Sequence, residues 1–202
     1  MQSLAGQTVL IATGNNGKLA EFSALLAPLG TTLVSLRNIG LTEPEETASS
    51  FAGNARIKAL AGLAGSGLPT LADDSGLLVE GFGGAPGVYT ADWAERDGAR
   101  DFTVAMRKVW ALLEALRVPP PRRARFHCTL ALAWPDGAVA VFDGEIEGEI
   151  VWPPRGSTGH GFDPVFRPLG HSKTFAEMPE NGKNRISHRA VAVGKLREAC
   201  FT

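Results

Sequence analysis

The opening of the chain constrains its fold more than any other feature. Residues 8–13 (Thr-Val-Leu-Ile-Ala-Thr) form a short apolar run, and the turn formers Gly-Asn-Asn-Gly follow at 14–17. Leucine and phenylalanine then recur at helical spacing over residues 18–29, and Gly30 ends the pattern. Residues 31–36 predict a second strand. Strand, turn, helix and strand in this order indicate the start of an α/β sheet.

The rest of the sequence continues the alternation of helical and extended patterns. It predicts helices over residues 50–64, 101–117 and 187–199. It also predicts a hairpin over residues 125–145 and short strands over residues 68–72 and 77–80. No repeat, low-complexity tract or linker interrupts them. We therefore predict an α/β fold with a mixed central sheet flanked by helices, and a single domain over residues 1–202. Residues 100–150 are expected to form a second lobe on the same sheet.

Composition excludes several classes of protein. Twenty Lys and Arg residues stand against 21 Asp and Glu residues, a formal net charge of −1, so the chain lacks the basic excess of proteins that bind a nucleic-acid backbone. Two cysteines, Cys128 and Cys200, make neither a disulfide framework nor a CxxC motif, and both are interpreted as plain buried thiols. With no signal peptide and no apolar run long enough to span a bilayer, we expect a cytoplasmic protein without membrane or nucleic-acid partners.

The first candidate site is the turn after the opening strand, Thr13-Gly14-Asn15-Asn16-Gly17-Lys18. Glycines between a strand and a helix let backbone N–H groups approach an anion, and the start of the helix adds partial positive charge. Lys18 adds a full charge. The turn is not a Walker A loop, because Ala12 and Leu19 stand where that motif needs Gly and Ser or Thr. An ordinary turn with an exposed lysine is the alternative.

Two acidic clusters are candidates for binding a divalent metal. The first is Glu45-Glu46-Thr47, and the second is Asp73-Asp74-Ser75-Gly76, expected at a strand end. Mg²⁺ usually takes one or two carboxylates and fills its shell with phosphate oxygens and water. Adjacent aspartates cannot both ionise without cost, so one of them is expected to have a raised pKa and to activate water. The alternatives are a solvated acidic loop for residues 43–46 and a turn with Asp and Ser capping for residues 73–76.

Three further groups have the chemistry of a nucleotide site. Asn54 and Lys58 lie four residues apart on a predicted helix and so share a face. The loop His160-Gly161-Phe162-Asp163 offers a ring for stacking and a carboxylate acceptor. Lys183, His188 and Arg189 add donors near the final helix, and positive charge at its start is unfavourable unless a ligand compensates it. Each group also has an ordinary structural explanation. Together they suit a nucleoside triphosphate with a metal ion.

The order of these motifs resembles the inosine triphosphate pyrophosphatases, also called XTP/dITP diphosphatases. Besides the motifs above, the resemblance includes Gly84-Ala85-Pro86-Gly87-Val88-Tyr89, Arg125-Phe126-His127-Cys128 and Ile186-Ser187-His188-Arg189, and it extends from residue 13 to residue 189. It implies hydrolysis of ITP, dITP and XTP to the monophosphate and pyrophosphate, which cleans the nucleotide pool. It also implies Mg²⁺, a homodimer, and two lobes with an active-site cleft between them.

The resemblance assigns roles to individual residues. Asp74 matches the proton acceptor, and Glu45 and Asp74 match the metal ligands. Substrate contacts are implied for a larger set: Thr13, Gly14, Asn15, Asn16, Gly17, Lys18, Asn54, Lys58, Ser75, His160, Gly161, Phe162, Asp163, Lys183, His188 and Arg189. His188 and Arg189 are the preferred donors to the O6 atom of the base. His160 departs from the family, which often has Phe there, so its base preference is expected to differ.

Two other functions fit the same residues. One is a pyrophosphatase of the Maf type, which acts on other altered nucleotides. The other is a nucleotide-binding module without turnover, although a plain binder has less need for a carboxylate that activates water.

Overall fold

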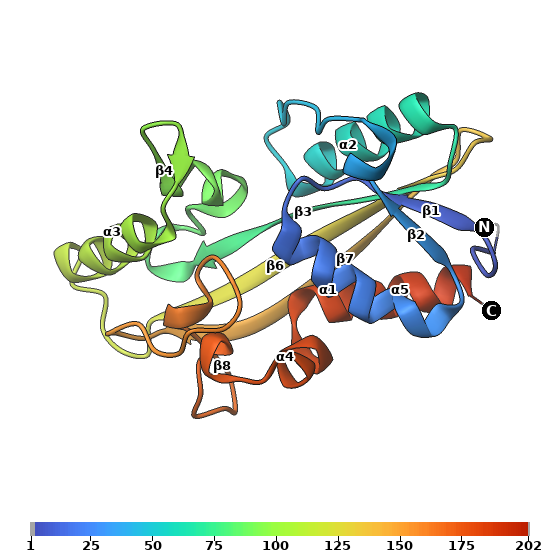
Figure 1. Cartoon of the computed structure of the whole chain (residues 1–202). Helices are drawn as coiled ribbons and strands as arrows, with labels where there is room; N and C mark the ends of the chain where they lie inside the picture. Colours follow the sequence, from blue (N-terminus) through green and yellow to red (C-terminus); the bar gives the residue numbers. More distant parts are fainter. Residues whose placement is uncertain (1–2, 202) are drawn as a thin grey trace. The chain divides into compact units, whose positions relative to one another are not determined.

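The computed structural model describes residues 3–201 and contains a six-stranded sheet with the strand order β2-β1-β3-β6-β7-β8 (Figure 1). The strands are β1 (Thr8–Ile11), β2 (Thr32–Ser35), β3 (Thr70–Val79), β6 (Arg123–Ala133), β7 (Val139–Ile150) and β8 (Phe166–Pro168). β1 pairs in parallel with both β2 and β3, whereas β7 and β8 are antiparallel. The sheet is therefore mixed, as the sequence predicted.

Five α-helices accompany the sheet: α1 (Asn16–Leu26), α2 (Phe51–Ser66), α3 (Phe102–Ala115), α4 (Glu180–Ile186) and α5 (His188–Cys200). Their ends follow local sequence signals. Ser50 caps the start of α2 by accepting the N–H of Gly53, and Gly67 ends the same helix in the left-handed conformation. Within residues 3–201 no helix is both long enough and apolar enough to cross a membrane.

The chain divides into two compact units. Unit 1 comprises Met1–Asp74, Cys128–Gly144 and Arg189–Thr202, and unit 2 comprises Ser75–His127 and Glu145–His188. Strands β3, β6 and β7 contribute residues to both. The predicted second lobe over residues 100–150 is wrong in its bounds, because the middle of the hairpin belongs to unit 1. The single domain over residues 1–202 stays a prediction beside these two units.

Unit 1 has a core on each face of its part of the sheet. Alternate strand residues point to opposite faces, so Val9 and Ile11 of β1 pack with α1 and α5, while Leu10 and Ala12 pack with α2. The α2 side is lined with alanines and allows a close approach. A Cβ on Gly62 of α2 would lie 2.7 Å from a methyl group of Thr70. Strand β1 is thus buried on both faces.

Unit 2 has its own aromatic core. Phe126 of β6 lies 4.4 Å from Phe166 and 6.0 Å from Phe175, measured between ring centroids. Leu113 of α3 and Leu77 of β3 belong to the same buried cluster. A two-stranded ribbon, β4 (Glu95–Arg96) with β5 (Ala99–Arg100), lies in this unit and was not predicted.

The structure differs from the sequence prediction around β3, and it contains two short elements that the sequence did not predict. The two short strands predicted around Asp73 and Asp74 are one continuous strand, β3, so these aspartates lie inside a strand and not at its end. Polar residues interrupt the apolar pattern there, and the pattern alone could not show that the backbone continues. α4 and β8 were missed because both are short. Both cysteines are buried free thiols, as predicted, and burial raises the pKa of Cys128 to about 12.

Candidate functional site

The turn between β1 and α1 is built by its own side chains. Asn15 caps α1, and its Oδ1 accepts the N–H groups of Gly17 and Lys18 at 2.9 and 3.1 Å. The hydroxyl of Thr13 accepts the N–H of Asn15 at 3.2 Å. Asn16 begins the helix. The predicted loop therefore forms, with Lys18 in the first turn of α1.

Asp73 and Asp74 are separated by the geometry of β3. Because successive strand residues point to opposite faces, Asp73 lies on the side of α1 and α5, and Asp74 lies on the side of α2. Asp73 pairs with Lys18 of α1 and Arg189 of α5. Asp74 accepts from Asn54 of α2 at 3.0 Å. Two adjacent carboxylates thus have different partners.

Asp73 is the ionised member of the pair. Its Oδ2 lies 2.9 Å from Lys18 Nζ and 3.4 Å from an Nη of Arg189, which also pairs with the buried Glu21 of α1. Burial by itself raises the pKa of Asp73, but the positive charges of Lys18, Arg189 and Lys58 outweigh it and hold the pKa well below its ordinary value. Arg189 is 1% exposed, and its charge is balanced inside unit 1.

Asp74 has the opposite shift. Burial raises the pKa of Asp74 above its ordinary value, and the negative charge of Glu46 adds to the rise, against the influence of Lys58. The predicted carboxylate with a raised pKa is therefore Asp74. Lys58 is buried but stays charged, because Asp73, Glu46 and Asp74 together raise its pKa despite burial.

The first acidic cluster reaches this site through Glu46 and not through Glu45. Lys58 pairs with Glu46 and lies 3.5 Å from Glu43. Glu45 is exposed, and within residues 3–201 its side chain makes no hydrogen bond or ion pair. Glu45 and Glu46 are neighbours in an irregular segment, so the sequence could not decide which of them points inward.

The donor set fits a hard divalent cation. Across the described part of the chain, no group of three or more His, Cys, Asp and Glu side chains is placed to hold a metal ion. Glu46 and Asp74 provide two carboxylates whose charges interact around Lys58. Two carboxylates with shell positions left for phosphate oxygens and water is the usual arrangement for Mg²⁺, whereas Zn²⁺ takes three or four nitrogen or sulfur ligands.

In unit 2, Asp163 holds the predicted nucleoside loop together. Its Oδ2 accepts the backbone N–H of His160 at 2.8 Å and lies 2.5 Å from Nζ of Lys183 on α4. A Cβ on Gly159 would come within 2.1 Å of the same oxygen, so glycine is required there. Asp163 and Lys183 are both buried. Their pair fixes the shape of the loop.

Two aromatic residues of unit 2 are less available than the sequence suggested. Phe162 was expected to offer its ring for stacking, but it is 1% exposed and packs edge-to-face against Phe102 at 5.7 Å. A ring this buried belongs to the core of unit 2, and its stacking on a base stays a prediction. The imidazole of His188 stacks on Phe126 at 5.0 Å and is also buried. Ser75 is half-buried and directly follows Asp74, and Gly161 is half-buried in the loop.

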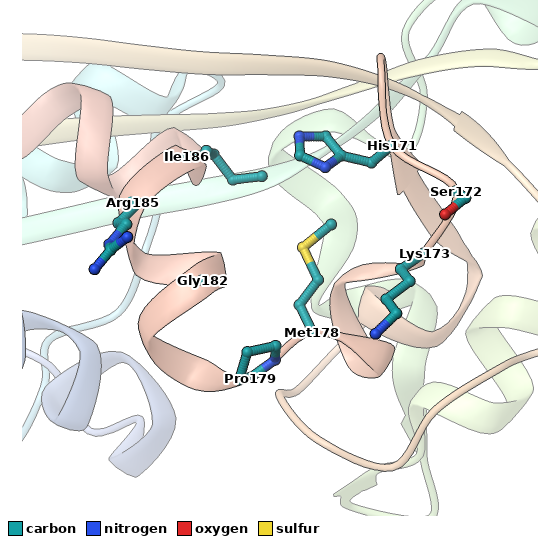
Figure 2. A pocket seen from close by; sticks show the side chains of 8 residues that line it. All are labelled: His171, Ser172, Lys173, Met178, Pro179, Gly182, Arg185 and Ile186. Atoms are coloured by element: carbon teal, nitrogen blue, oxygen red, sulfur yellow. The ribbon is translucent and has the colours of Figure 1, made fainter.

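A separate pocket of about 290 Å³ lies in unit 2 (Figure 2). Its lining is apolar at Met178, Pro179 and Ile186, and it includes His171, Lys173 and Arg185. None of the predicted site residues lines it. It is therefore distinct from the candidate site.

Sequence reasoning missed Glu21 and Glu43, and it named Glu46 only as a member of the first acidic cluster. Glu21 had an available signal, since it lies three residues after Lys18 and so shares its helix face. Glu43 had none, because it belongs to an irregular segment.

These observations define the class of protein. It is an α/β protein in which a strand-to-helix loop, two aspartates with opposite pKa shifts and three cations, of which Lys58 and Arg189 are buried, form one cluster within unit 1. Known proteins share this architecture. The solved structure of a HAM1 protein from Coxiella burnetii has a TM-score of 0.85 at 37% identity, covering 96% of this chain and 98% of that one.

The sequence comparisons agree with the structural one. Residues 9–199 match the Ham1 family, so the chain belongs to the Ham1 family. A dITP/XTP pyrophosphatase of Ruegeria pomeroyi is 54% identical over 196 residues, covering 97% of this chain and 96% of that protein. One from Rhizobium meliloti is 49% identical over 212 residues, covering 100% and 99%. The resemblance inferred from the motifs is thereby confirmed.

Proposed function

We propose that this protein hydrolyses non-standard purine nucleoside triphosphates, namely ITP, dITP and XTP, to the monophosphate and pyrophosphate. The different environments of Asp73 and Asp74 carry the proposal, because one carboxylate can hold the cations while the other can accept a proton. Asp73 stays ionised and holds Lys18 and Arg189. Asp74, with its raised pKa, is suited to take a proton from water. The pyrophosphatase relatives support this choice of substrate.

In the proposed mechanism, the residues of unit 1 bind the phosphates and activate water. The N–H group of Gly14 and the ammonium groups of Lys18 and Lys58 bind the phosphate oxygens and offset charge as the anhydride breaks. Asp74, oriented by the amide of Asn54, accepts the proton of the water that attacks the α-phosphorus. The bond to the bridging oxygen then breaks and pyrophosphate leaves.

We propose that Mg²⁺ is the cofactor and that Glu46 and Asp74 hold it. When bound, it would polarise phosphate oxygens and neutralise part of their charge. Glu46 replaces Glu45, which the sequence had suggested, because of these two neighbours it is Glu46 that pairs with Lys58 beside Asp74.

Selectivity for the base is assigned to unit 2. A site that donates to O6 rejects adenine, because donor would then face donor. The backbone N–H groups of residues 160–163 and the imidazole of His188 are the proposed donors. Arg189 is held by Glu21 and Asp73, so we assign it to charge balance in unit 1. Lys183 supports the loop through Asp163.

A panel of nucleotides tests the proposal. ITP, dITP, XTP, ATP, GTP, dTTP and UTP are each supplied with Mg²⁺, and pyrophosphate and orthophosphate are measured separately. We expect pyrophosphate from the first three, with little from ATP. Preference for dTTP or UTP would favour the Maf type, and binding of ITP without pyrophosphate would favour a non-catalytic module.

We also propose that the protein is a cytoplasmic homodimer. The resemblance to the pyrophosphatases is the basis for both statements. Light scattering coupled to size-exclusion chromatography tests the first, with twice the mass of 21.3 kDa expected for the dimer. Fractionation of cells tests the location.

A further inference from the structure

A carboxylate already binds to the proposed phosphate loop. Glu43 Oε2 accepts the backbone N–H of Gly14 at 2.9 Å, and Glu43 Oε1 lies 3.5 Å from Lys58 Nζ. One donor belongs to the turn after β1, and the other belongs to α2 on the side of Asp74. Glu43 therefore bridges two groups that the proposed function assigns to substrate phosphate.

The local structure is shaped to admit this carboxylate. A Cβ on Gly14 would lie only 2.8 Å from Glu43 Oε2, so a side chain at residue 14 would push the carboxylate away. The next N–H groups of the loop are satisfied by its own side chains, those of Asn15 and Thr13. The N–H of Gly14 differs, because its acceptor comes from a segment 29 residues away.

Glu43 is also free to leave. Its side chain is 32% exposed, and it belongs to residues 41–48, which have neither helix nor strand. Lys58, by contrast, is buried, and it also pairs with Glu46, whose side chain is 35% exposed. An exposed carboxylate on an irregular segment exchanges its contacts readily, because few packing contacts hold it.

We propose that Glu43 is a resident counter-ion of the phosphate site, which a substrate phosphate must displace from Gly14 and Lys58. The proposal rests on the proposed function for the identity of the substrate. A phosphate oxygen and the Glu43 carboxylate accept from the same two donors and carry the same sign of charge. They therefore compete, and Glu43 weakens binding of the substrate without taking part in the chemistry.

Replacing Glu43 by glutamine is the direct test. Glu43→Gln removes the negative charge and keeps the size of the side chain. We expect its KM for ITP to fall about three- to tenfold while kcat stays within about twofold, since a stabilising contact of the free enzyme is lost. Glu198→Gln is the matched control, because it removes the same charge from an exposed position of α5 in the same unit.

A binding measurement separates this inference from the proposed function. Inorganic tripolyphosphate is titrated calorimetrically into wild type, Glu43→Gln and Glu198→Gln in Mg²⁺ buffer. Tighter binding by Glu43→Gln alone supports the resident counter-ion. If that result appears while no nucleotide is hydrolysed by wild type, the inference stands and the proposed function fails.

Other results would overturn the inference. If wild type hydrolyses ITP but Glu43→Gln shows unchanged KM and unchanged tripolyphosphate affinity, Glu43 does not compete. If kcat and Mg²⁺ affinity both fall, Glu43 is instead a metal ligand. Glu43→Ser is a second variant, which removes the reach of the side chain as well as its charge. It should behave like Glu43→Gln, and a far-UV circular dichroism spectrum like that of wild type verifies its folding.

Discussion

Each unit contains a buried aspartate beside a buried lysine, but the two groups have different consequences for the structure. In unit 2, Asp163 meets Lys183 and the N–H of His160, and this local pair fixes a loop. In unit 1, Asp74 shares Lys58 with Glu46 and Asp73, so negative charge exceeds positive charge around that lysine. In unit 2, opposite charges are equal in number and the pair fixes a loop. In unit 1, the excess of negative charge around Lys58 leaves Asp74 with a raised pKa.

The difference between the units originates in their secondary structure. Asp163 lies in a tight loop whose glycine leaves room for the carboxylate. Asp73 and Asp74 lie in a strand that directs them to opposite faces, so each has its own set of helices as partners. Neighbouring carboxylates therefore need not share an environment, and four experiments test the difference between the two units.

The largest expected effect is on turnover. Asp74→Asn should lower kcat for ITP by about 10²- to 10⁴-fold, the usual range for loss of a general base. Its folding should survive. Because burial raises the pKa of Asp74, the ionised carboxylate costs stability at neutral pH, and the metal-free variant should be at least as stable as wild type. A folded variant with full activity would refute the role of Asp74.

The pair in unit 2 should matter for stability. Lys183→Met leaves Asp163 as an uncompensated buried charge, so the free energy of unfolding should fall by about 3–5 kcal/mol. Urea denaturation measures the loss. Lys173→Met is the control on an exposed loop and should change stability by less than about 0.5 kcal/mol. Equal effects of the two variants would show that the Asp163–Lys183 pair does not stabilise the folded protein.

The two glutamates of the first cluster should differ in metal affinity. Glu46→Gln should weaken Mg²⁺ binding at least about tenfold, since even groups that only support a metal ligand contribute about 10- to 100-fold. Glu45→Gln should have a much smaller effect. Activity titrated against Mg²⁺ concentration gives both values. The reverse order would restore the assignment that the sequence suggested.

The smallest effect concerns acid stability. The pKa of Asp73 is lower in the folded protein than its ordinary value of 3.8, so the unfolded chain takes up the proton first as pH falls. The stability from Asp73 is complete above the ordinary value and is lost as pH falls through the lower folded value. Metal-free Asp73→Asn should therefore lose less stability in acid than wild type does. Asp97→Asn, at an exposed position, should behave like wild type in urea denaturation across this pH range.

Much of the fold was readable from local patterns. The opening strand and helix, the caps at Ser50 and Gly67, and the turn at residues 135–137 all depend on residues close together in the chain. The continuous β3 was not readable, because polar residues interrupt its apolar pattern. The candidate phosphate loop and the two aspartates were found from sequence, but their partners were not.

By itself, the sequence determined which chemical groups are present, their order and the family they belong to, since motifs and helix caps are short-range features. Only the tertiary structure decided which carboxylate pairs with which cation. Asp73 and Asp74, or Glu45 and Glu46, are adjacent in the chain and chemically alike. What separates them is the face of a strand or the path of a loop, and contacts with residues far away in the sequence set both.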